Sequence, residues 1–180
     1  MPDLVVVYGA PLSGKTSLAW RLARSFPDKT AIVGTDQLLT GSIAVAADDA
    51  SDELDMVHVQ LRLLVANYLK NGYNVVVEGP FIFERDGHLY NYEADIDQLL
   101  ALMRHLTSRA IVVQLQADEA TLARRAAHDR RNAELPAALR IGAAYRARYG
   151  VRFYSFDTVE LSVEAVVLEV RKALADQPAG

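Results

Sequence analysis

The sequence predicts a three-layer α/β fold, in which a five-stranded parallel sheet is flanked by helices on both faces. The first reason is that short, unbroken runs of β-branched and other aliphatic residues recur along the chain, as in strands buried on both sides. The second is that amphipathic helical patterns separate these runs. Because right-handed crossover helices pack on the faces of the sheet that they connect, this alternation favours parallel strands.

Five segments are expected to form the sheet. The first four are short and nearly continuous in aliphatic residues, which is typical of strands buried on both faces. The fifth alternates more between apolar and polar residues, so we expect it nearer an edge. In chain order, the five predicted strands span residues 4–8, 31–33, 75–77, 111–115 and 151–156.

Helices are expected between the strands. Apolar residues at helical spacing define helices within 15–26, 54–68 and 96–103. Asp118 and Ser162 are good N-cap residues for two later helices. Two remaining segments are expected to be loops at the functional edge of the sheet, and they span residues 48–55 and 81–92.

The length of 180 residues and the hydrophobic content of 51% suit one domain with one core. We expect that domain to span residues 1–175, followed by a disordered tail over 176–180. The absence of cysteine excludes disulfides, thiolate zinc sites and a cysteine nucleophile, which fits a reducing compartment. No apolar run approaches the roughly 18 residues of a membrane span, so a cytoplasmic protein without a membrane partner is expected.

Charge is unevenly distributed along the chain. The net charge of −4 argues against a protein whose whole surface binds nucleic acid. Residues 124–152, however, contain eight arginines against only Asp129 and Glu134, so this stretch carries +6 and the remainder −10. Arginines this dense, with few local acids to pair them, indicate phosphate binding, and we expect a short Arg-rich lid over about 126–137. The alternative is a solvated helical face with ordinary ion pairs.

The segment GAPLSGKT fits the pattern G-x-x-x-x-G-K-[ST], directly after a predicted strand and directly before a predicted helix. In such a loop, the backbone amides and the helix N-terminus surround phosphate groups, and the lysine reaches the outer phosphates. Thr16 is therefore expected to ligate Mg²⁺ beside a bound nucleotide. The predicted nucleotide-binding residues of this segment are Gly9, Ala10, Pro11, Leu12, Ser13, Gly14, Lys15, Thr16 and Ser17.

Asp36 follows the second predicted strand, where sheet topology places it across the cleft from the phosphate loop. A carboxylate at this place accepts the proton of an acceptor hydroxyl, or orients that hydroxyl, in phosphoryl transfer. The alternative role is that of a cap on the following helix. Asp36 is thus the predicted catalytic base, and Lys15 is predicted to stabilise the transition state.

Glu78 ends the third predicted strand, at the position where proteins with such a loop usually hold a magnesium-bound water. Its side chain is expected to reach the metal shell or, alternatively, to bind the acceptor. Gly79 and Pro80 then predict a sharp backbone turn that opens an acceptor pocket. Arg85, beyond this turn, is a candidate acceptor contact, with a solvated loop arginine as the alternative.

With these residues, the chain resembles the small kinases of the nucleoside monophosphate kinase-like branch of P-loop proteins, over nearly its whole length. The likeness is to the group that phosphorylates hydroxyls, with polynucleotide-kinase-like, zeta-toxin-like, chloramphenicol-phosphotransferase-like and gluconate- or shikimate-kinase-like members. The resemblance implies a P-loop NTPase fold, ATP and Mg²⁺ as cofactors, and Asp36 as the acid that acts on the acceptor hydroxyl. It also implies that Asp157 and Thr158 lie near the adenine.

The resemblance also places the start of the lid at four arginines. Arg125 and Arg130 are the predicted catalytic pair, and Arg124 and Arg131 the predicted nucleotide-binding pair. Arg125 and Arg130 are five residues apart, whereas the family commonly spaces two lid arginines four apart. The turn after Glu78 also lacks the arginine with which adenylate kinases bind a monophosphate, which argues against a nucleotide acceptor.

The sequence therefore predicts an ATP-dependent phosphotransferase that moves the γ-phosphate to a hydroxyl of a small molecule, or of a nucleic-acid end or base. Nucleic acid is expected as a substrate only. One alternative is a nucleoside monophosphate kinase, which needs cationic groups around the acceptor phosphate. The other is an ATP-binding switch protein that transfers nothing. No sequence feature predicts an oligomeric state.

Overall fold

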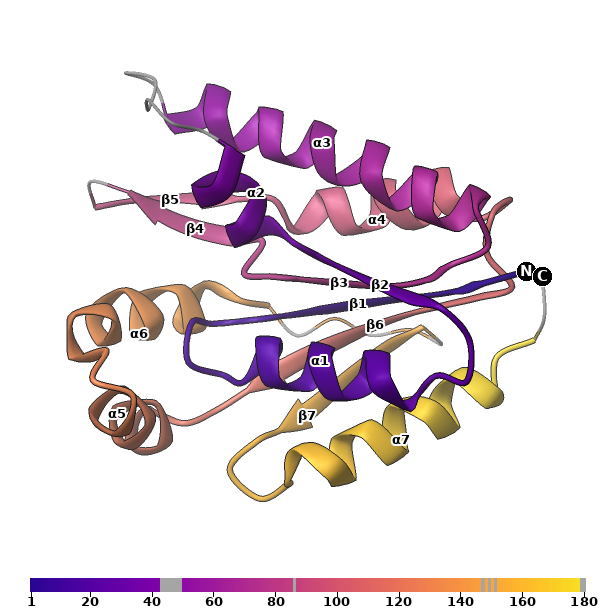
Figure 1. The fold of residues 1–180 in the computed structure, drawn as a ribbon. Helices are drawn as coiled ribbons and strands as arrows, with labels where there is room; N and C mark the ends of the chain where they lie inside the picture. Colours follow the sequence, from indigo (N-terminus) through magenta and orange to yellow (C-terminus); the bar gives the residue numbers. More distant parts are fainter. Residues whose placement is uncertain (43–49, 86, 147, 149, 151, 179–180) are drawn as a thin grey trace.

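In the computed structural model, which describes residues 1–42, 50–85, 87–146, 148, 150 and 152–178, the chain has the predicted three-layer α/β fold. A five-stranded sheet lies between two layers of helices (Figure 1). All four ladders of this sheet are parallel. In the order in which they lie side by side, its strands are β2 (Thr30–Gly34), β3 (Asn74–Gly79), β1 (Asp3–Gly9), β6 (Arg109–Gln116) and β7 (Phe153–Asp157).

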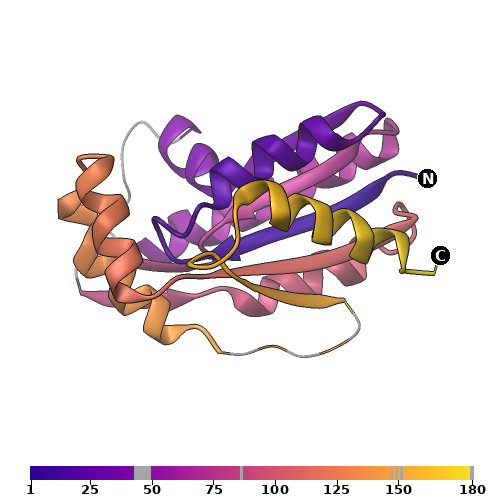
Figure 2. The ribbon, with the colours of Figure 1, turned by 90° about the horizontal axis from the view of Figure 1, so that it is seen from below.

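The central strand, β1, is buried on both faces, as its unbroken aliphatic run predicts. Leu4 and Val6 belong to the hydrophobic cluster of one face, whereas Val5 and Val7 belong to that of the other. Two helices cover each face, one pair above the sheet in Figure 1 and one pair below it, where Figure 2 shows it in front. The upper pair is α3 (Ala50–Lys70) and α4 (Glu93–Met103), and the lower pair is α1 (Lys15–Ser25) and α7 (Val163–Ala175).

The five predicted strands are confirmed, with small differences at their ends. The predicted loop over residues 81–92 is wrong, because most of this segment forms an antiparallel hairpin of β4 (Ile82–Arg85) and β5 (His88–Asn91). The first two residues of β4 are buried and anchor the hairpin, and Gly87 has the positive φ of 78° that suits a tight turn. Strands of four residues are too short to show a clear period in the sequence.

The predicted loop over residues 48–55 is wrong from Ala50 onward, where α3 begins. Asp52 and Glu53 lie in the first turn of this helix, where acidic side chains stabilise the helix dipole. Residues 48 and 49 lie outside the described residues. None of the helices in the described part of the chain has both the length and the apolar character that a membrane span requires.

The C-terminal tail predicted from residue 176 onward begins with two hydrogen-bonded residues. The backbone N–H of Asp176 donates to the carbonyl oxygen of Lys172 over 3.0 Å. The side-chain amide of Gln177 donates to the hydroxyl of Tyr154 over 3.1 Å. The start of the tail is therefore held against β7, and residues 179–180 lie outside the described residues.

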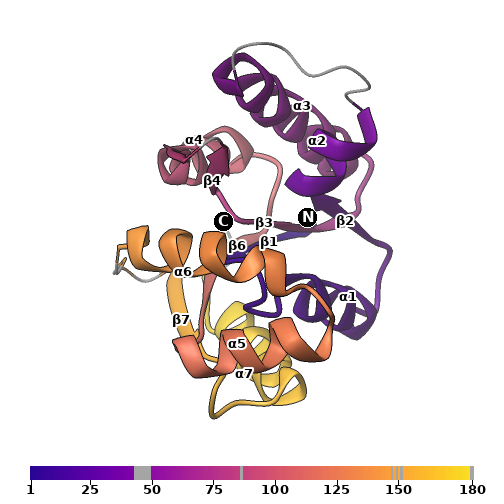
Figure 3. The ribbon, with the colours of Figure 1, turned by 90° about the vertical axis from the view of Figure 1, so that its left-hand side faces the viewer.

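The carboxyl ends of the parallel strands meet at one edge of the sheet, which faces the viewer in Figure 3. α2 (Thr35–Ser42) and the hairpin lie on one side of this edge, and the predicted lid region lies on the other (Figure 3). Residues 126–137 comprise the end of α5 (Glu119–His128), the 3₁₀ turn η1 (Asn132–Glu134) and the start of α6 (Leu135–Ala144). These segments surround the edge at which open α/β sheets bind their ligands.

Candidate active site

The phosphate loop between β1 and α1 depends on glycine at two positions. Gly14 is the N-cap residue of α1 and has a φ of 99°. Gly9 has a φ of 153°, and a Cβ at this position would lie 2.4 Å from the carbonyl oxygen of Leu115. Both positions therefore exclude or disfavour a side chain. The unpaired amides at the N-terminus of α1 and the helix dipole provide the anion site that the motif predicts.

Lys15, the first residue of α1, is only 7% exposed. Its ammonium group donates a hydrogen bond to the carbonyl oxygen of Ala10 over 2.9 Å, across the loop. Burial lowers the pKa of Lys15, and the nearby carboxylates of Asp36 and Glu78 oppose that shift. The fold thus brings the loop lysine close to both acids that the sequence singled out.

Glu78, on β3, lies beside the phosphate loop and is buried. The hydroxyl of Thr16 donates to its carboxylate over 3.2 Å. Burial raises the pKa of Glu78, while Lys15 and the hydrogen bond from Thr16 act in the opposite direction. The described residues contain no cluster of three or more His, Cys, Asp or Glu that would bind a metal ion alone. A hydroxyl and one carboxylate suit Mg²⁺ shared with nucleotide phosphates and water.

A cavity of about 490 Å³ extends from the phosphate loop to both sides of the strand edge. Residues 11–18 line its centre. In the sheet, β2 and β3 lie on one side of β1, whereas β7 lies on the other side. Side chains that follow β2 and β3 therefore line one end of the cavity, and those that follow β7 line the opposite end. We call these the apolar end, with Leu161, Val163 and Val166, and the Asp36 end, with Asp36, Pro80 and Phe83.

Asp36 lies in the first turn of α2, one residue after the helix begins at Thr35, so it is not the N-cap residue. Its exposed side chain lines the cavity. The hydroxyl of Thr40 donates to the backbone carbonyl oxygen of Asp36 over 2.7 Å, and not to its side chain. Within the described residues no group donates a hydrogen bond to the Asp36 carboxylate, which is therefore available to a bound molecule.

Two of the four predicted lid arginines, Arg125 and Arg131, line the cavity. The guanidinium of Arg125 donates to the carbonyl oxygens of Leu12, over 3.1 Å, and of Thr158, over 2.8 Å. Arg125 thus links the phosphate loop to the segment after β7. Arg131 forms a two-pronged ion pair with Glu134, in which the Arg131 Nε lies 2.6 Å from Oε1.

The other two lid arginines, Arg124 and Arg130, are exposed and do not belong to the cavity lining. Arg124 donates to the hydroxyl of Thr121, on its own helix, over 3.2 Å. Arg130 has a φ of 56°, and the amide of Arg131 bonds the carbonyl of Ala126 over 2.8 Å, which closes the helix with a Schellman turn. This turn determines which of the two consecutive arginines reaches the cavity.

The remaining predicted site residues are divided between the cavity and its surroundings. Arg85 pairs with the buried carboxylate of Glu53 over 2.7 Å and does not line the cavity. Its guanidinium instead ties the hairpin to α3. Thr158 lines the cavity beside Arg125, whereas the carboxylate of Asp157 accepts the backbone N–H of Val159 over 2.8 Å.

One residue that connects the site, Tyr145, was not found by sequence reasoning. It follows α6, and its hydroxyl donates to the carbonyl oxygen of Gly9 over 3.1 Å. Its side chain also packs against the hydrophobic cluster that contains Ile82 of the hairpin. Tyr145 thus joins the lid, the phosphate loop and the hairpin. Its partner Gly9 is 136 residues away along the chain, so no local pattern signals the contact.

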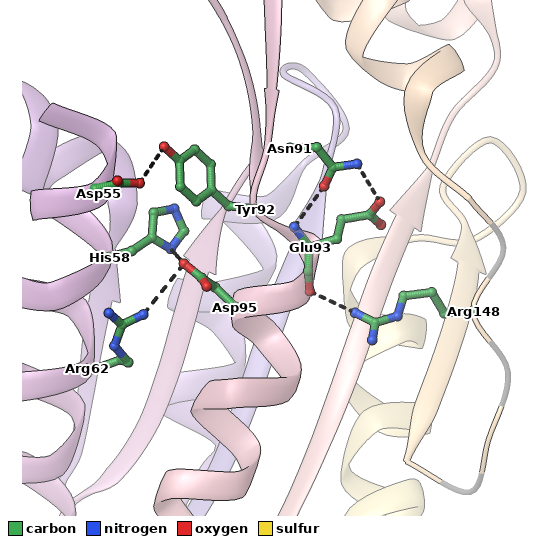
Figure 4. A network of polar contacts seen from close by, with 8 residues as sticks. All are labelled: Asp55, His58, Arg62, Asn91, Tyr92, Glu93, Asp95 and Arg148. Atoms are coloured by element: carbon green, nitrogen blue, oxygen red, sulfur yellow. Dashed lines mark hydrogen bonds and ion pairs between the residues drawn. The ribbon is translucent and has the colours of Figure 1, made fainter. Parts of the chain in front are cut away.

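Phe83, at the Asp36 end, is supported from behind by His58, with ring centroids 6.1 Å apart. His58 is 1% exposed and stacks on Tyr92 at 4.4 Å, and its Nδ1 lies 3.1 Å from the Asp95 carboxylate (Figure 4). Burial lowers the pKa of His58 to about 4, although Asp95 opposes the shift. At neutral pH the imidazole is therefore uncharged and supports the cavity wall.

Comparison with known proteins gives the chain a family. A model of the AAA domain family matches residues 4–150. No curated protein matches the sequence.

Several similar solved structures are named as kinases. The APS kinase of Mycobacterium tuberculosis, in complex with AMPPNP and APS, is 15% identical with a TM-score of 0.71, over 97% of this chain and 98% of that one. A gluconokinase from Sinorhizobium meliloti is 22% identical with a TM-score of 0.58, over 97% and 90%. A sugar kinase from a Janibacter species is 15% identical with a TM-score of 0.62, over 98% and 95%. The family match over most of its length and the shared fold together show that this chain belongs to the AAA domain family and has the fold of the small P-loop kinases.

Proposed function

We propose that this protein transfers the γ-phosphate of ATP to a hydroxyl group of a small acceptor. The observation that carries the proposal is that the phosphate loop with Lys15 and the unpaired carboxylate of Asp36 line one cavity. A carboxylate without a hydrogen-bond donor is unfavourable beside a site that only binds phosphate, because both groups are negative. The same carboxylate suits a hydroxyl acceptor whose proton it accepts.

On the donor side, the loop amides and the N-terminus of α1 bind the phosphates, and Lys15 neutralises their charge. The side chains of the apolar end provide a surface for the adenine. Arg125 holds the segment of Thr158 beside that surface through its two carbonyl hydrogen bonds. The nucleotide therefore binds with its base at the apolar end and its γ-phosphate toward Asp36.

On the acceptor side, the Asp36 carboxylate takes the proton of the acceptor hydroxyl while the hydroxyl oxygen bonds to the γ-phosphorus. The bond between that phosphorus and the bridging oxygen breaks, and ADP leaves. Arg131 stabilises the charge on the transferring group. We assign this role to Arg131 and not to Arg130, because Arg131 lines the cavity and interacts electrostatically with both Lys15 and Asp36.

The hydroxyl of Thr16 and the carboxylate of Glu78 fit a magnesium ion that accompanies the nucleotide. When bound, Mg²⁺ neutralises charge on the β- and γ-phosphates. Thr16 would hold the ion directly, and Glu78 would accept hydrogen bonds from water in its shell. Glu78 then serves the metal, and the acceptor depends on Asp36.

Transfer to a hydroxyl has more support than transfer to a phosphate. The cations that line the described cavity are Lys15, Arg125 and Arg131. The first two belong to the donor side, which leaves a nucleoside monophosphate without a dedicated cation. The names of the similar structures, a gluconokinase, an APS kinase and a sugar kinase, also support a small-molecule acceptor. A nucleic-acid acceptor is favoured only by Arg124 and Arg130, outside the cavity.

The test is transfer of a radiolabelled γ-phosphate from Mg²⁺-ATP to pooled hydroxyl compounds, nucleoside monophosphates and 5′-hydroxyl oligonucleotides, with Asp36→Asn in parallel. We expect label on a hydroxyl compound and a loss of about 10²–10⁴-fold in the variant. Asp28→Asn is the matched control, because Asp28 is also exposed but precedes β2 at the opposite edge of the sheet. Label on a monophosphate, or ATP binding without any transfer, would contradict the proposal.

A further inference from the structure

The half of the protein that forms the Asp36 end is strongly acidic. Residues 30–103 build β2, α2, α3, β3, the hairpin and α4. This segment contains twelve acidic residues against three basic ones, Arg62, Lys70 and Arg85. From Thr30 to Leu61 the sequence contains no lysine or arginine. Nine of the twelve acids lie in the described part of this segment, and one of them, Asp36, lines the side of the cavity where we place the acceptor.

The described arginines near this end already have carboxylate partners. Arg85 pairs with Glu53 over 2.7 Å, and Arg140, from the lid, pairs with Glu84 on the hairpin. Both carboxylates are largely buried, at 8% and 10% side-chain exposure, which holds the guanidinium groups in place. The charge of Arg140 is thus neutralised by an acid of the hairpin, and that of Arg85 by an acid of α3.

Two further arginines are engaged at the N-terminal end of α4, as Figure 4 shows. Arg62 lies 3.5 Å from the carboxylate of Asp95, and Arg148 donates to the backbone carbonyl of Glu93 over 3.2 Å. Arg148 also pairs with Asp97. His58, between these groups and Phe83, adds no charge at neutral pH. In contrast, no hydrogen bond or ion pair engages the Asp36 carboxylate among the described residues, although Lys15 and Arg131 interact with it electrostatically.

From this distribution of charge we infer that the acceptor is a hydroxyl compound that carries a protonated amine, such as an amino sugar or an amino alcohol. The inference rests on the proposed function and names its substrate class. A phosphorylated or carboxylated acceptor would meet the carboxylate of Asp36 and the γ-phosphate, while Arg85 and Arg140 are already paired with carboxylates. An ammonium group gains from the same surroundings. Phe83 and Pro80 provide an apolar wall for the carbon face of such a molecule.

The test uses matched acceptors that differ only in charge. For several scaffolds, among them a hexose, a nucleoside and an aryl alcohol, the amine, its N-acetyl derivative and the corresponding acid are compared at equal concentration. We expect kcat/KM for the amine to exceed that for the neutral compound by about tenfold, and that for the acid by more. The advantage should fall as pH rises above the pKa of the amine itself, because the free base lacks the charge.

Binding provides a readout that does not need turnover. With the protein loaded with Mg²⁺ and AMPPNP, thermal unfolding is followed as each matched compound is added. The amine should raise the Tm at lower concentration than the N-acetyl compound or the acid. Equal effects of the three would contradict the inference.

A charge variant tests the acidic surroundings directly. Glu84→Gln removes a negative charge from the hairpin and leaves Arg140 without its carboxylate partner. We therefore expect about a three- to tenfold lower kcat/KM for the amine, with less effect on the neutral compound. Glu164→Gln is the control, because Glu164 also pairs with an arginine, Arg21, but on α1 and α7 away from this end.

The outcomes separate the two proposals. Preference for neutral or acidic hydroxyl compounds would overturn the inference about the amine and leave hydroxyl transfer intact. Label on a phosphate group, or no label on any acceptor with intact ATP binding, would overturn both.

Discussion

The hydroxyl of Thr16 donates to the carboxylate of Glu78 over 3.2 Å, which joins the first turn after the phosphate loop to the end of the neighbouring strand. The two residues lie on either side of the position where a nucleotide-bound magnesium ion is expected. Because Glu78 is buried, its ionised form is destabilised in the folded protein. The site therefore contains a carboxylate that suits the metal but lowers the stability of the free protein.

Replacement of this carboxylate should stabilise the free protein. Glu78→Gln keeps an acceptor for Thr16 and removes the buried charge, so we expect Tm at pH 7 to rise by about 2–4 °C. The folded-state pKa of Glu78 is raised, so ionisation costs stability above it. The advantage of the variant should shrink as pH falls through that raised pKa and vanish below the ordinary value of 4.5.

The same substitution should weaken catalysis, because the metal loses an outer carboxylate. We expect kcat/KM to fall by about 10–100-fold, with a higher Mg²⁺ requirement. Scanning calorimetry from pH 4 to pH 8 and a magnesium titration of activity measure the two effects. Glu164→Gln, which removes an exposed carboxylate, should change Tm little. A Glu78→Gln variant less stable than wild type at pH 7 would contradict the account of burial.

Arg125 should stabilise both the empty site and the bound nucleotide. Arg125→Ala leaves the carbonyl oxygens of Leu12 and Thr158 without their guanidinium partner, so we expect a loss of about 1–3 kcal/mol in unfolding free energy. ATP affinity should fall about tenfold, because the loop and the segment after β7 lose their connection. Urea unfolding and calorimetric titration measure these changes. Arg124→Ala is the control, because Arg124 is the neighbouring residue and lies outside the cavity. It should change the unfolding free energy and the ATP affinity much less than Arg125→Ala does.

The fold was predictable where one side chain type dominates a segment. β1, β3 and β6 are buried on both faces, which requires the unbroken aliphatic runs that the sequence displays. The phosphate loop was predictable because its chemistry depends on adjacent residues. Asp36 lies in the cavity with Lys15, as sheet topology predicted, and its role as base stays a prediction.

What could not be predicted depends on contacts between distant segments. Counting acids within the basic stretch suggested that its arginines lacked partners, yet Arg140 pairs with Glu84, 56 residues away. Arg85 likewise pairs with Glu53, which is 32 residues away. Whether Arg130 or Arg131 lines the cavity depends on the positive φ of Arg130 in the turn that ends α5. Arginine rarely adopts a positive φ, so its presence in the sequence does not predict such a turn.

Consecutive lid arginines should differ sharply in function. Arg131→Ala should lower kcat by about 10²–10³-fold, because Arg131 lines the cavity where charge develops on the transferred group. Arg130→Gly also removes a positive charge, but glycine adopts the φ of 56° at this position without the backbone strain of arginine. We therefore expect the unfolding free energy to rise by about 0.4–1 kcal/mol, with little change in kcat. Steady-state kinetics and urea unfolding of both variants test the assignment. A large loss of kcat in Arg130→Gly alone would reverse it.

The hydroxyl of Tyr145 should stabilise the phosphate loop by holding the end of the lid against it. Tyr145→Phe removes the hydrogen bond to the Gly9 carbonyl while the ring keeps its packing against Tyr8. We expect a loss of about 1–2 kcal/mol in unfolding free energy, since the Gly9 carbonyl is left without this partner. Tyr68→Phe is the control, because the Tyr68 hydroxyl makes no hydrogen bond within the described residues.

The effect of Tyr145→Phe on activity distinguishes a local contact from a link between lid and loop. If the hydroxyl only stabilises the fold, kcat and KM for ATP should be unchanged well below the melting temperature. Because the hydroxyl joins the residue after α6 to the first glycine of the loop, we expect KM for ATP to rise about three- to tenfold at 25 °C. Steady-state kinetics of the wild type and the variant, at a temperature where both are fully folded, distinguish these two roles. An unchanged KM for ATP would show that the Tyr145 hydroxyl only stabilises the fold.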